Sequence, residues 1–163
     1  TLKHKLTYTF FLCLLVLVGC TASDGECRKE KVVVMGVSLY KTVFDTEKEA
    51  FVSSPTKEKM TIKGLNNDSI LYQEQSLSTF YLPLRALQST SAFVLQRGIL
   101  EPDTIVISHE NVNQFISLEC GCFVYHTIKS TATTTHQIDS LVIENTYVQN
   151  VSENHLRIYY RVN

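Results

Sequence analysis

The 163-residue sequence contains no tryptophan, only six glycines and three prolines, and no excess of charge of either sign. So few glycines and prolines exclude collagen-like and proline-rich low-complexity chains. A formal net charge of -1 excludes a nucleic-acid binder that works through bulk basicity, so we expect no nucleic-acid partner. The absence of tryptophan argues against the strongest kind of sugar-stacking platform, while 44% hydrophobic residues argue against a disordered chain.

Signatures of known catalytic sites are also missing: there is no Gly-x-Ser-x-Gly, P-loop, Gly-x-Gly-x-x-Gly or His-Glu-x-x-His motif. Cys122 and His126 are four residues apart, which in a strand is about 13 Å and beyond hydrogen-bond reach. Cys120 and Cys122 are separated by one residue, which is shorter than the usual spacing of structural zinc ligands. We therefore expect a non-enzymatic protein with no catalytic residue, no metal and no cofactor.

The first twenty residues have the pattern of an export signal. Lys3 and Lys5 precede an unbroken apolar run at 10–18, which is too short to span a bilayer and fits the core of a secretory signal. The run ends in Leu17-Val18-Gly19-Cys20, which resembles a bacterial lipobox. Small residues before the cysteine admit the peptidase, and the thiol of Cys20 takes the lipid, so we expect lipidation at Cys20.

Three segments follow from this interpretation. Residues 1–19 are predicted to be a lipoprotein signal peptide, and residues 20–31 the lipidated cysteine and a polar tether. Residues 32–163 are predicted to form a single β domain. We expect an outer-membrane lipoprotein held by its lipid anchor. The acidic residues Asp24 and Glu26 slightly favour the cell surface over the periplasmic face.

Three cysteines remain after Cys13 leaves with the signal and Cys20 is lipidated: Cys27, Cys120 and Cys122. An exported compartment is oxidising, so these thiols can form one intramolecular disulfide. Cys120 and Cys122 are predicted on the same face of one strand, with Cα atoms at the upper limit of bridging distance. A disulfide from Cys27 to either Cys120 or Cys122 is therefore favoured.

Alternation of apolar and polar residues dominates the rest of the chain and is typical of strands with one buried face. Nine segments are predicted as strands: 31–40, 57–65, 69–73, 78–84, 90–97, 103–109, 114–128, 138–149 and 155–162. Residues 41–56 are the least regular, and 45–50 are compatible with one helical turn. Four histidines, near strand ends or in loops, are interpreted as exposed or capping residues: His109, His126, His136 and His155.

Polar stretches at 66–68, 101–103, 110–113, 130–135 and 150–154 are predicted as turns or loops, with hairpin loops at 110–113 and 150–154. Pro83 is expected at an edge or a strand end, and Gly121 at a bulge. About nine strands at regular spacing predict an all-β fold, an antiparallel β-sandwich. A closed β-barrel is the alternative.

The order of several motifs resembles a family of small Bacteroidetes-type lipoproteins that is known only as a domain of unknown function. The motifs are Cys20 and Cys27, Phe80-Tyr81-Leu82-Pro83-Leu84, Asp103-Thr104-Ile105-Val106-Ile107, Phe115 to Gly121, Ile138-Asp139-Ser140 and Leu156-Arg157-Ile158-Tyr159-Tyr160. The resemblance implies an exported lipoprotein with an all-β domain, and it implies no reaction, ligand or catalytic residue. The family pattern has one cysteine near position 120, so the additional Cys122 leaves the disulfide pairing open.

Three Asp-Ser/Thr-apolar triplets match the O-glycosylation acceptor of such bacteria, with acceptors at Ser69, Thr104 and Ser140. The alternative is that Asp followed by Ser or Thr simply begins a strand after a turn. For the whole protein, we expect a non-enzymatic β domain at the cell envelope that binds a protein or glycan partner. The alternatives are a β-barrel carrier of a small apolar ligand and an enzyme with an unrecognised site.

Overall fold

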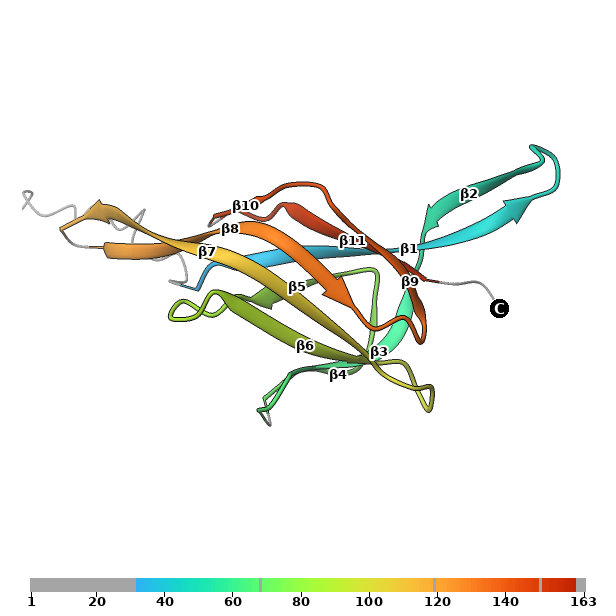
Figure 1. The fold of residues 1–163 in the computed structure, drawn as a ribbon, viewed down its shortest axis with the longest axis horizontal. Coiled ribbons are helices and arrows are strands. Elements are labelled where there is room, and N and C mark those ends of the chain that lie inside the picture. The colour runs from blue at the N-terminus through green and yellow to red at the C-terminus, as the bar shows by residue number, and fades with distance from the viewer. Residues whose placement is uncertain (1–31, 68, 119, 150, 161–163) are drawn as a thin grey trace, which may run out of the picture.

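The computed structural model describes residues 32–67, 69–118, 120–149 and 151–160. Within these residues, eleven strands form two open sheets, as the predicted β-sandwich requires, rather than a closed barrel (Figure 1). The strands are β1 (Val34–Asp45), β2 (Ala50–Pro55), β3 (Glu58–Gly64), β4 (Ile70–Leu77), β5 (Thr79–Pro83), β6 (Thr90–Gln96), β7 (Asp103–Ser117), β8 (Gly121–Thr133), β9 (Ile138–Ile143), β10 (Tyr147–Val148) and β11 (Asn154–Tyr160).

The first sheet is built around β1. One edge of β1 pairs with β5 along its first half and with β2 along its second half, and the other edge pairs with β11, which is followed by β9. The β1–β11 pairing is parallel, with Val37 opposite Leu156 and Tyr40 opposite Tyr159, whereas the other pairings in this sheet are antiparallel. Pro83 ends β5, as predicted.

The second sheet has the order β10-β8-β7-β6-β3-β4 and is antiparallel throughout. Side chains from the inner faces of both sheets form one apolar core, because alternate residues of each strand point between the sheets. The largest fully buried side chains are Tyr160, Phe80, Met35, Leu39, Met60, Ile62, Leu82, Ile105, Ile107, Ile138, Leu156 and Ile158. The described residues contain no helix long and apolar enough to span a bilayer.

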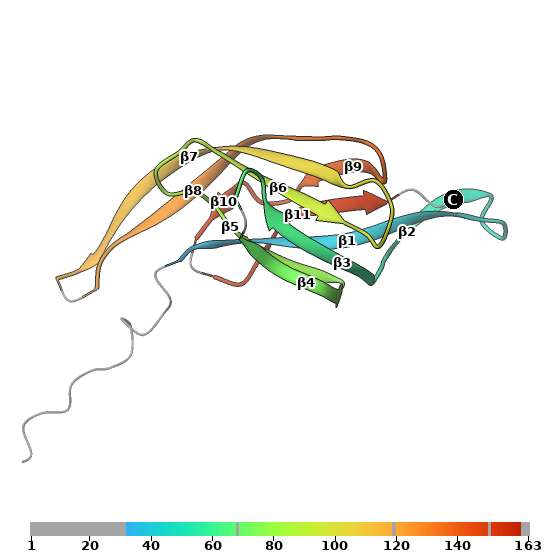
Figure 2. The same ribbon diagram turned by 90° about the horizontal axis from the view of Figure 1, so that it is seen from below.

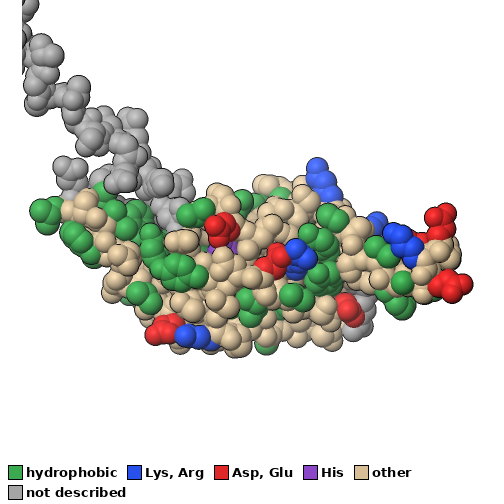
Figure 3. All heavy atoms as spheres, turned by 90° about the horizontal axis from the view of Figure 1, so that it is seen from above, with side chains coloured by type: hydrophobic (Ala, Val, Ile, Leu, Met, Phe, Trp, Pro, Cys, Tyr) green, Lys and Arg blue, Asp and Glu red, His purple; other side chains and the backbone are tan. Residues whose placement is uncertain are grey.

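Two hairpins extend past the sandwich at opposite ends of the molecule, the β1–β2 hairpin at one end and the β7–β8 hairpin at the other (Figures 1 and 2). β1 begins at the β7–β8 end. In the space-filling view of Figure 3, charged side chains gather at the β1–β2 end and hydrophobic side chains at the β7–β8 end. The long axis therefore has two chemically different ends.

Both hairpins differ from the sequence-based prediction. Residues 41–56 form most of the β1–β2 hairpin. The prediction of a helical turn at 45–50 was therefore wrong, because these residues connect two paired strands. Residues 110–113 are not a hairpin loop but the middle of β7, where polar side chains are accommodated because one face is half-open to solvent. Residues 114–128 are not one strand, because β7 ends at Ser117 and the antiparallel β8 begins at Gly121, which takes a φ of +73°.

Two segments that were predicted as loops also have a different structure. β8 continues to Thr133, so the threonine-rich stretch 130–135 is largely strand, consistent with the β-propensity of threonine. The segment 150–154 joins β10 in the second sheet to β11 in the first and is therefore a crossing between sheets instead of a hairpin loop. Eleven strands form instead of about nine, because β2 lies in a stretch predicted as irregular and the predicted strand 138–149 is divided into β9 and β10.

Candidate functional site

A buried polar cluster lies where β6, β7 and β8 meet. Ser91, His109 and His126 are 1%, 2% and 2% exposed, which corrects the prediction that these two histidines are exposed or capping. Asn111 Oδ1 lies 2.8 Å from His109 Nδ1 and 2.7 Å from His126 Nδ1, and Ser91 Oγ lies 2.9 Å from His109 Nε2. The prediction failed because 110–113 was assigned to a loop, which placed His109 at a strand end, and because the strand of His126 was predicted to end at 128, whereas β8 continues to Thr133.

The protonation pattern of this cluster follows from Asn111. Its Nδ2 group donates to backbone carbonyl oxygens of the β5–β6 connection, those of Arg85, Ala86 and Gln88, at 2.8 to 3.1 Å. Its Oδ1 is therefore the acceptor, and both His109 and His126 donate through Nδ1–H. The remaining lone pair of His109, on Nε2, accepts from the Ser91 hydroxyl, whose oxygen also accepts from the Arg85 backbone N–H at 2.8 Å.

This order of groups resembles a serine–histidine–asparagine triad, but the geometry supports a structural role. The Ser91 oxygen is nearly inaccessible, and its lone pair is engaged by the Arg85 amide, so a substrate carbonyl cannot reach it. Burial lowers the pKa of His109. It also lowers the pKa of His126, to about 4 with the added proximity of His109, so both rings are neutral at neutral pH. The cluster fixes the β5–β6 connection against β7.

The two other histidines differ from each other. His155 is 1% exposed, again contrary to the prediction, and its Nδ1 accepts a hydrogen bond from the Gly36 backbone N–H at 3.1 Å. That bond holds the start of β11 against β1. His136 is partly exposed and lies 3.3 Å from Glu101, as expected for a surface histidine. The described residues contain no cluster of three or more potential metal ligands.

The three glycosylation candidates occupy different environments. Ser69 and Ser140 are exposed, whereas Thr104 is half-buried in β7. Asp103, the residue before Thr104, is 2% exposed and its carboxylate accepts from the Thr134 hydroxyl and the backbone amides of 136, 137 and 138. The local-structure interpretation therefore describes Asp103 well.

The two cysteines lie in different elements at the end of the β7–β8 hairpin. Cys122 lies in β8, exposed and free, and Cys120 lies in the turn, 3% exposed and not a free thiol. The prediction that both cysteines lie on one face of a single strand is therefore wrong. Cys20, Cys27 and the tether lie outside the described residues, so lipidation and the pairing of Cys27 stay predictions.

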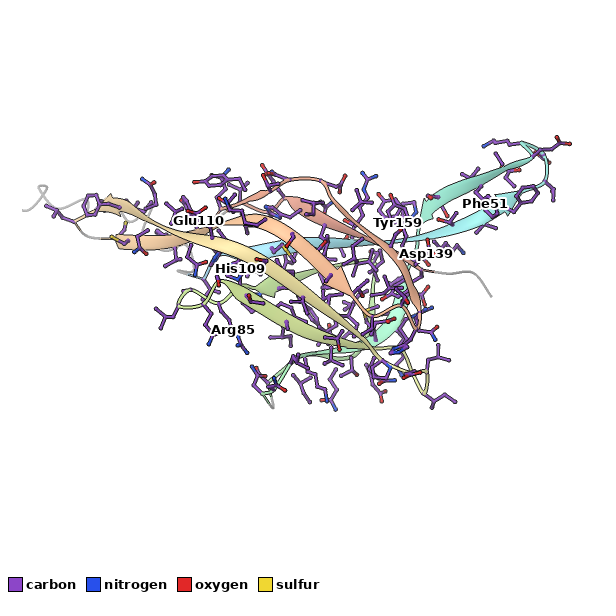
Figure 4. All side chains as sticks on the ribbon, in the orientation of Figure 1. Phe51, Arg85, His109, Glu110, Asp139 and Tyr159 are labelled. Atoms are coloured by element: carbon purple, nitrogen blue, oxygen red, sulfur yellow. The ribbon has the colours of Figure 1, made fainter. Side chains whose placement is uncertain are left out.

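A row of aromatic side chains, half-buried at the sandwich and exposed on the β1–β2 hairpin, follows the outer face of the first sheet. Tyr40, Thr42 and Phe44 lie on the face of β1 opposite Met35, Val37 and Leu39, which point into the core. Tyr40 meets Tyr159 of β11 with 5.5 Å between ring centroids, and Phe44 meets Phe51 of β2 edge to face at 5.2 Å. We call these four residues, Tyr40, Phe44, Phe51 and Tyr159, the aromatic strip. Figure 4 labels Phe51 on the projecting hairpin and Tyr159 near its base.

The aromatic strip exposes apolar area, and contacts between its neighbouring side chains fix its geometry. Phe51 is 75% and Phe44 49% exposed, while Thr42 and Ser53 share a hydrogen bond of 3.0 Å between the two aromatic pairs. Arg157 lies over the ring of Tyr40 at 4.9 Å and forms an ion pair with Glu144. The adjoining β1–β2 turn is acidic, with Asp45 accepting from the backbone amides of Glu47 and Lys48.

Sequence reasoning missed the phenylalanine pair. Residues 41–56 were interpreted as the least regular stretch, so no pairing of strands was expected there. The available signal was the alternation of Tyr40, Thr42 and Phe44, repeated in reverse by Phe51, Ser53 and Pro55 across a polar turn. That pattern is typical of a hairpin with one aromatic face.

The two sheets define a small β-sandwich domain. The model of the family of unknown function DUF6452 matches residues 59–160, from β3 through β11. The match covers more than half of the chain, so the chain belongs to this family. No curated protein and no solved structure gives a match.

Proposed function

We propose that this protein is an outer-membrane lipoprotein, anchored through Cys20, whose β-sandwich binds a protein partner through the aromatic strip. The proposal of a binding surface rests on the exposure of Phe44 and Phe51 on a projecting hairpin. Two phenylalanines packed on each other above a polar surround are typical of an interaction site, because water-exposed aromatic area is costly without a partner.

The chemistry of the strip favours a protein over a glycan. Sugar recognition pairs stacking with hydrogen bonds from nearby polar groups, but the Thr42 and Ser53 hydroxyls bond to each other. Phenylalanine supplies no hydrogen bond of its own, and it suits an apolar pocket on a protein. The turn beside it carries Asp45, Glu47 and Glu49 against Lys48, so the partner surface is expected to have a basic rim.

The proposal of a lipid anchor rests on the sequence Leu17-Val18-Gly19-Cys20 and on the placement of β1. β1 begins at the β7–β8 end of the molecule, so a chain held at Cys20 would present the β1–β2 hairpin away from the membrane (Figure 1). Such an arrangement leaves the strip accessible. It serves equally at the periplasmic face and at the cell surface, which protease treatment of intact cells distinguishes.

The anchor is tested by the intact mass of protein extracted from membranes of a native-type host, with and without reduction. We expect a mature chain that starts at Cys20 and carries acyl chains, with a two-dalton gain on reduction from one disulfide. The free state of Cys122 favours Cys27–Cys120 as that disulfide. A soluble chain that starts elsewhere and carries no lipid contradicts the proposal. It would make a secreted enzyme an alternative again.

The binding surface is tested by placing a photo-crosslinking residue at position 51 in cells and identifying the product. Leu87 is the matched control position, because it is 99% exposed and lies in the β5–β6 connection, away from the strip. The partner is then purified, and its affinity is measured. We expect Phe51→Ser to weaken binding about 30-fold or more and Leu87→Ser to leave it unchanged, since exposed aromatic anchors dominate interfaces. Equal crosslinking from both positions contradicts the assignment.

A further inference from the structure

We propose that the end of the β7–β8 hairpin inserts into the lipid bilayer to which the chain is anchored. This inference rests on the proposed lipid anchor at Cys20. The hairpin tip, defined here as Val112, Phe115 and Leu118, is 42%, 56% and 96% exposed. It lies at the end of the molecule opposite the aromatic strip, where hydrophobic side chains gather in Figure 3.

The composition of the hairpin end suits an apolar environment. Between Glu110 and Lys129, which form an ion pair of 2.7 Å, the sequence contains no lysine or arginine, and Glu119 is its single acid. Tyr125 of β8 lies opposite Val112, behind Phe115 and Leu118, and meets Tyr147 of β10 edge to face with 6.0 Å between centroids. Tyrosine is favoured at the boundary between lipid and water, so this pair is placed where the polar headgroups would begin.

The tether identifies the bilayer as the occupant. Val32, the first described residue, is twelve residue steps from Cys20, which at full extension is about 40 Å and as a flexible chain about 20 Å. β1 starts at the same end as the tip (Figures 1 and 2). The anchor therefore holds this end near the membrane at a high effective concentration, and no other end of the molecule is held so close.

The predicted Cys27–Cys120 disulfide would tighten this geometry. Cys120 lies in the turn that closes the hairpin, two residues from Leu118. A disulfide there would leave seven residues between the lipidated cysteine and the tip, at most about 25 Å of extended chain. An acyl anchor and an apolar tip then act on the same membrane as two signals, which together hold a protein more firmly and in one orientation.

Cys122 provides the reporter for the test. It is exposed, free and directly opposite Phe115 across β7 and β8. The full acylated protein is labelled there with an environment-sensitive fluorophore and inserted into vesicles of phosphatidylethanolamine and phosphatidylglycerol that contain brominated lipid. The control protein carries Cys122→Ser and Glu47→Cys, which moves the label to the β1–β2 turn. We expect about threefold or greater quenching at Cys122 relative to position 47, because bromine quenches only at contact with the acyl region.

Variants then separate insertion from simple proximity. Phe115→Ser with Leu118→Ser should reduce quenching at Cys122 to the level of position 47, whereas Leu87→Ser, an equally exposed leucine elsewhere, should not. Quenching should persist at high salt, because no basic residue of the hairpin end contributes an electrostatic contact. Loss of quenching at high salt overturns insertion through apolar side chains.

Three further outcomes show whether the inference, the lipid anchor or the assigned occupant is wrong. Acylated protein in which Cys122 is unquenched overturns the inference and leaves the lipid anchor standing. Protein that carries no acyl chain at Cys20 overturns the anchor and the inference together. A dimer in detergent that Leu118→Ser dissociates identifies the occupant of the tip as a second copy of this chain and overturns the bilayer.

Discussion

His109 and His126 meet edge to face across β7 and β8, 5.1 Å between ring centroids, and both donate to the one side-chain oxygen of Asn111. A shared neutral acceptor suits two neutral rings. Protonating them would place two positive charges side by side in a site that is 2% exposed, so burial lowers both pKa values. The cluster therefore makes the fold sensitive to acid.

The free energy of unfolding is expected to fall as the pH is lowered from about 6.5 toward 4. An unfolded histidine takes up a proton near pH 6.5, whereas His126 in the fold resists until about pH 4, so protons bind preferentially to the unfolded chain in this window. The contribution of His126 is fully present above pH 6.5 and amounts to roughly 2–3 kcal/mol. Urea unfolding at several pH values measures it.

A matched variant isolates the contribution of His126. His126→Asn places an amide N–H near the position of Nδ1 and removes the titrating ring, so the loss of stability between pH 6.5 and 4 should become smaller. A remainder is expected from His109 and His155, whose pKa values are also lowered by burial. An unchanged pH dependence in His126→Asn would show that its pKa is not displaced in the fold.

Among the polar residues of the second sheet, Asn111 is expected to cause the largest loss of stability when it is substituted. Its side chain satisfies two imidazoles and the carbonyls of the β5–β6 connection, so Asn111→Ala leaves several buried groups without partners. Each such group costs about 1–3 kcal/mol, and we expect a loss of about 3 kcal/mol or more in urea unfolding. Asn113→Ala is the control, because Asn113 is exposed on the same strand. Similar losses for both variants would refute the assigned role.

The sandwich could be predicted from sequence because alternation marks every strand of its core, as Leu156, Ile158 and Tyr160 illustrate. The interior of β7 could not, because Asn111 and Asn113 have turn propensity and only tertiary contacts, through His126 and the β5–β6 connection, make Asn111 a strand residue. The aromatic strip depended on the same kind of contact. Phe44 and Phe51 become neighbours only when the β1–β2 hairpin is formed.

Gly36 is expected to tolerate no side chain. A Cβ atom at this position would lie 2.0 Å from the backbone oxygen of Glu153, and the Gly36 amide also donates to His155. Backbone cannot yield as a flexible side chain can, so Gly36→Ala should separate β1 from the start of β11. We expect a loss of about 3 kcal/mol or more, as in overpacked cores, measured by thermal or urea unfolding.

Gly98 supplies the comparison for Gly36. It has a φ of +55° with open space around its Cβ position, so Gly98→Asn, which tolerates a left-handed backbone, should cost well under about 1 kcal/mol. A Gly36→Ala protein as stable as Gly98→Asn would contradict the close approach of β1 to Glu153.

O-glycosylation, if this chain is modified in its native host, should occur at Ser140 and Ser69 and not at Thr104. A transferase needs the acceptor and its preceding aspartate exposed in an extended segment. Thr104 fails this requirement, because its backbone N–H and C=O are bonded to Thr134 and the Asp103 carboxylate is buried under four donors. Ser140 meets it, being exposed on β9.

Ser140 is also the more consequential site, because it is the cross-strand neighbour of Tyr159 in the aromatic strip. A glycan there would border the proposed binding surface and limit which partners approach it. Glycopeptide mass spectrometry of protein from a native-type host measures occupancy, with Ser140→Ala and Thr104→Ala as the paired variants. The first should lose one glycan mass and the second none. A glycan lost with Thr104→Ala would mean that modification precedes folding, since the folded strand hides that acceptor.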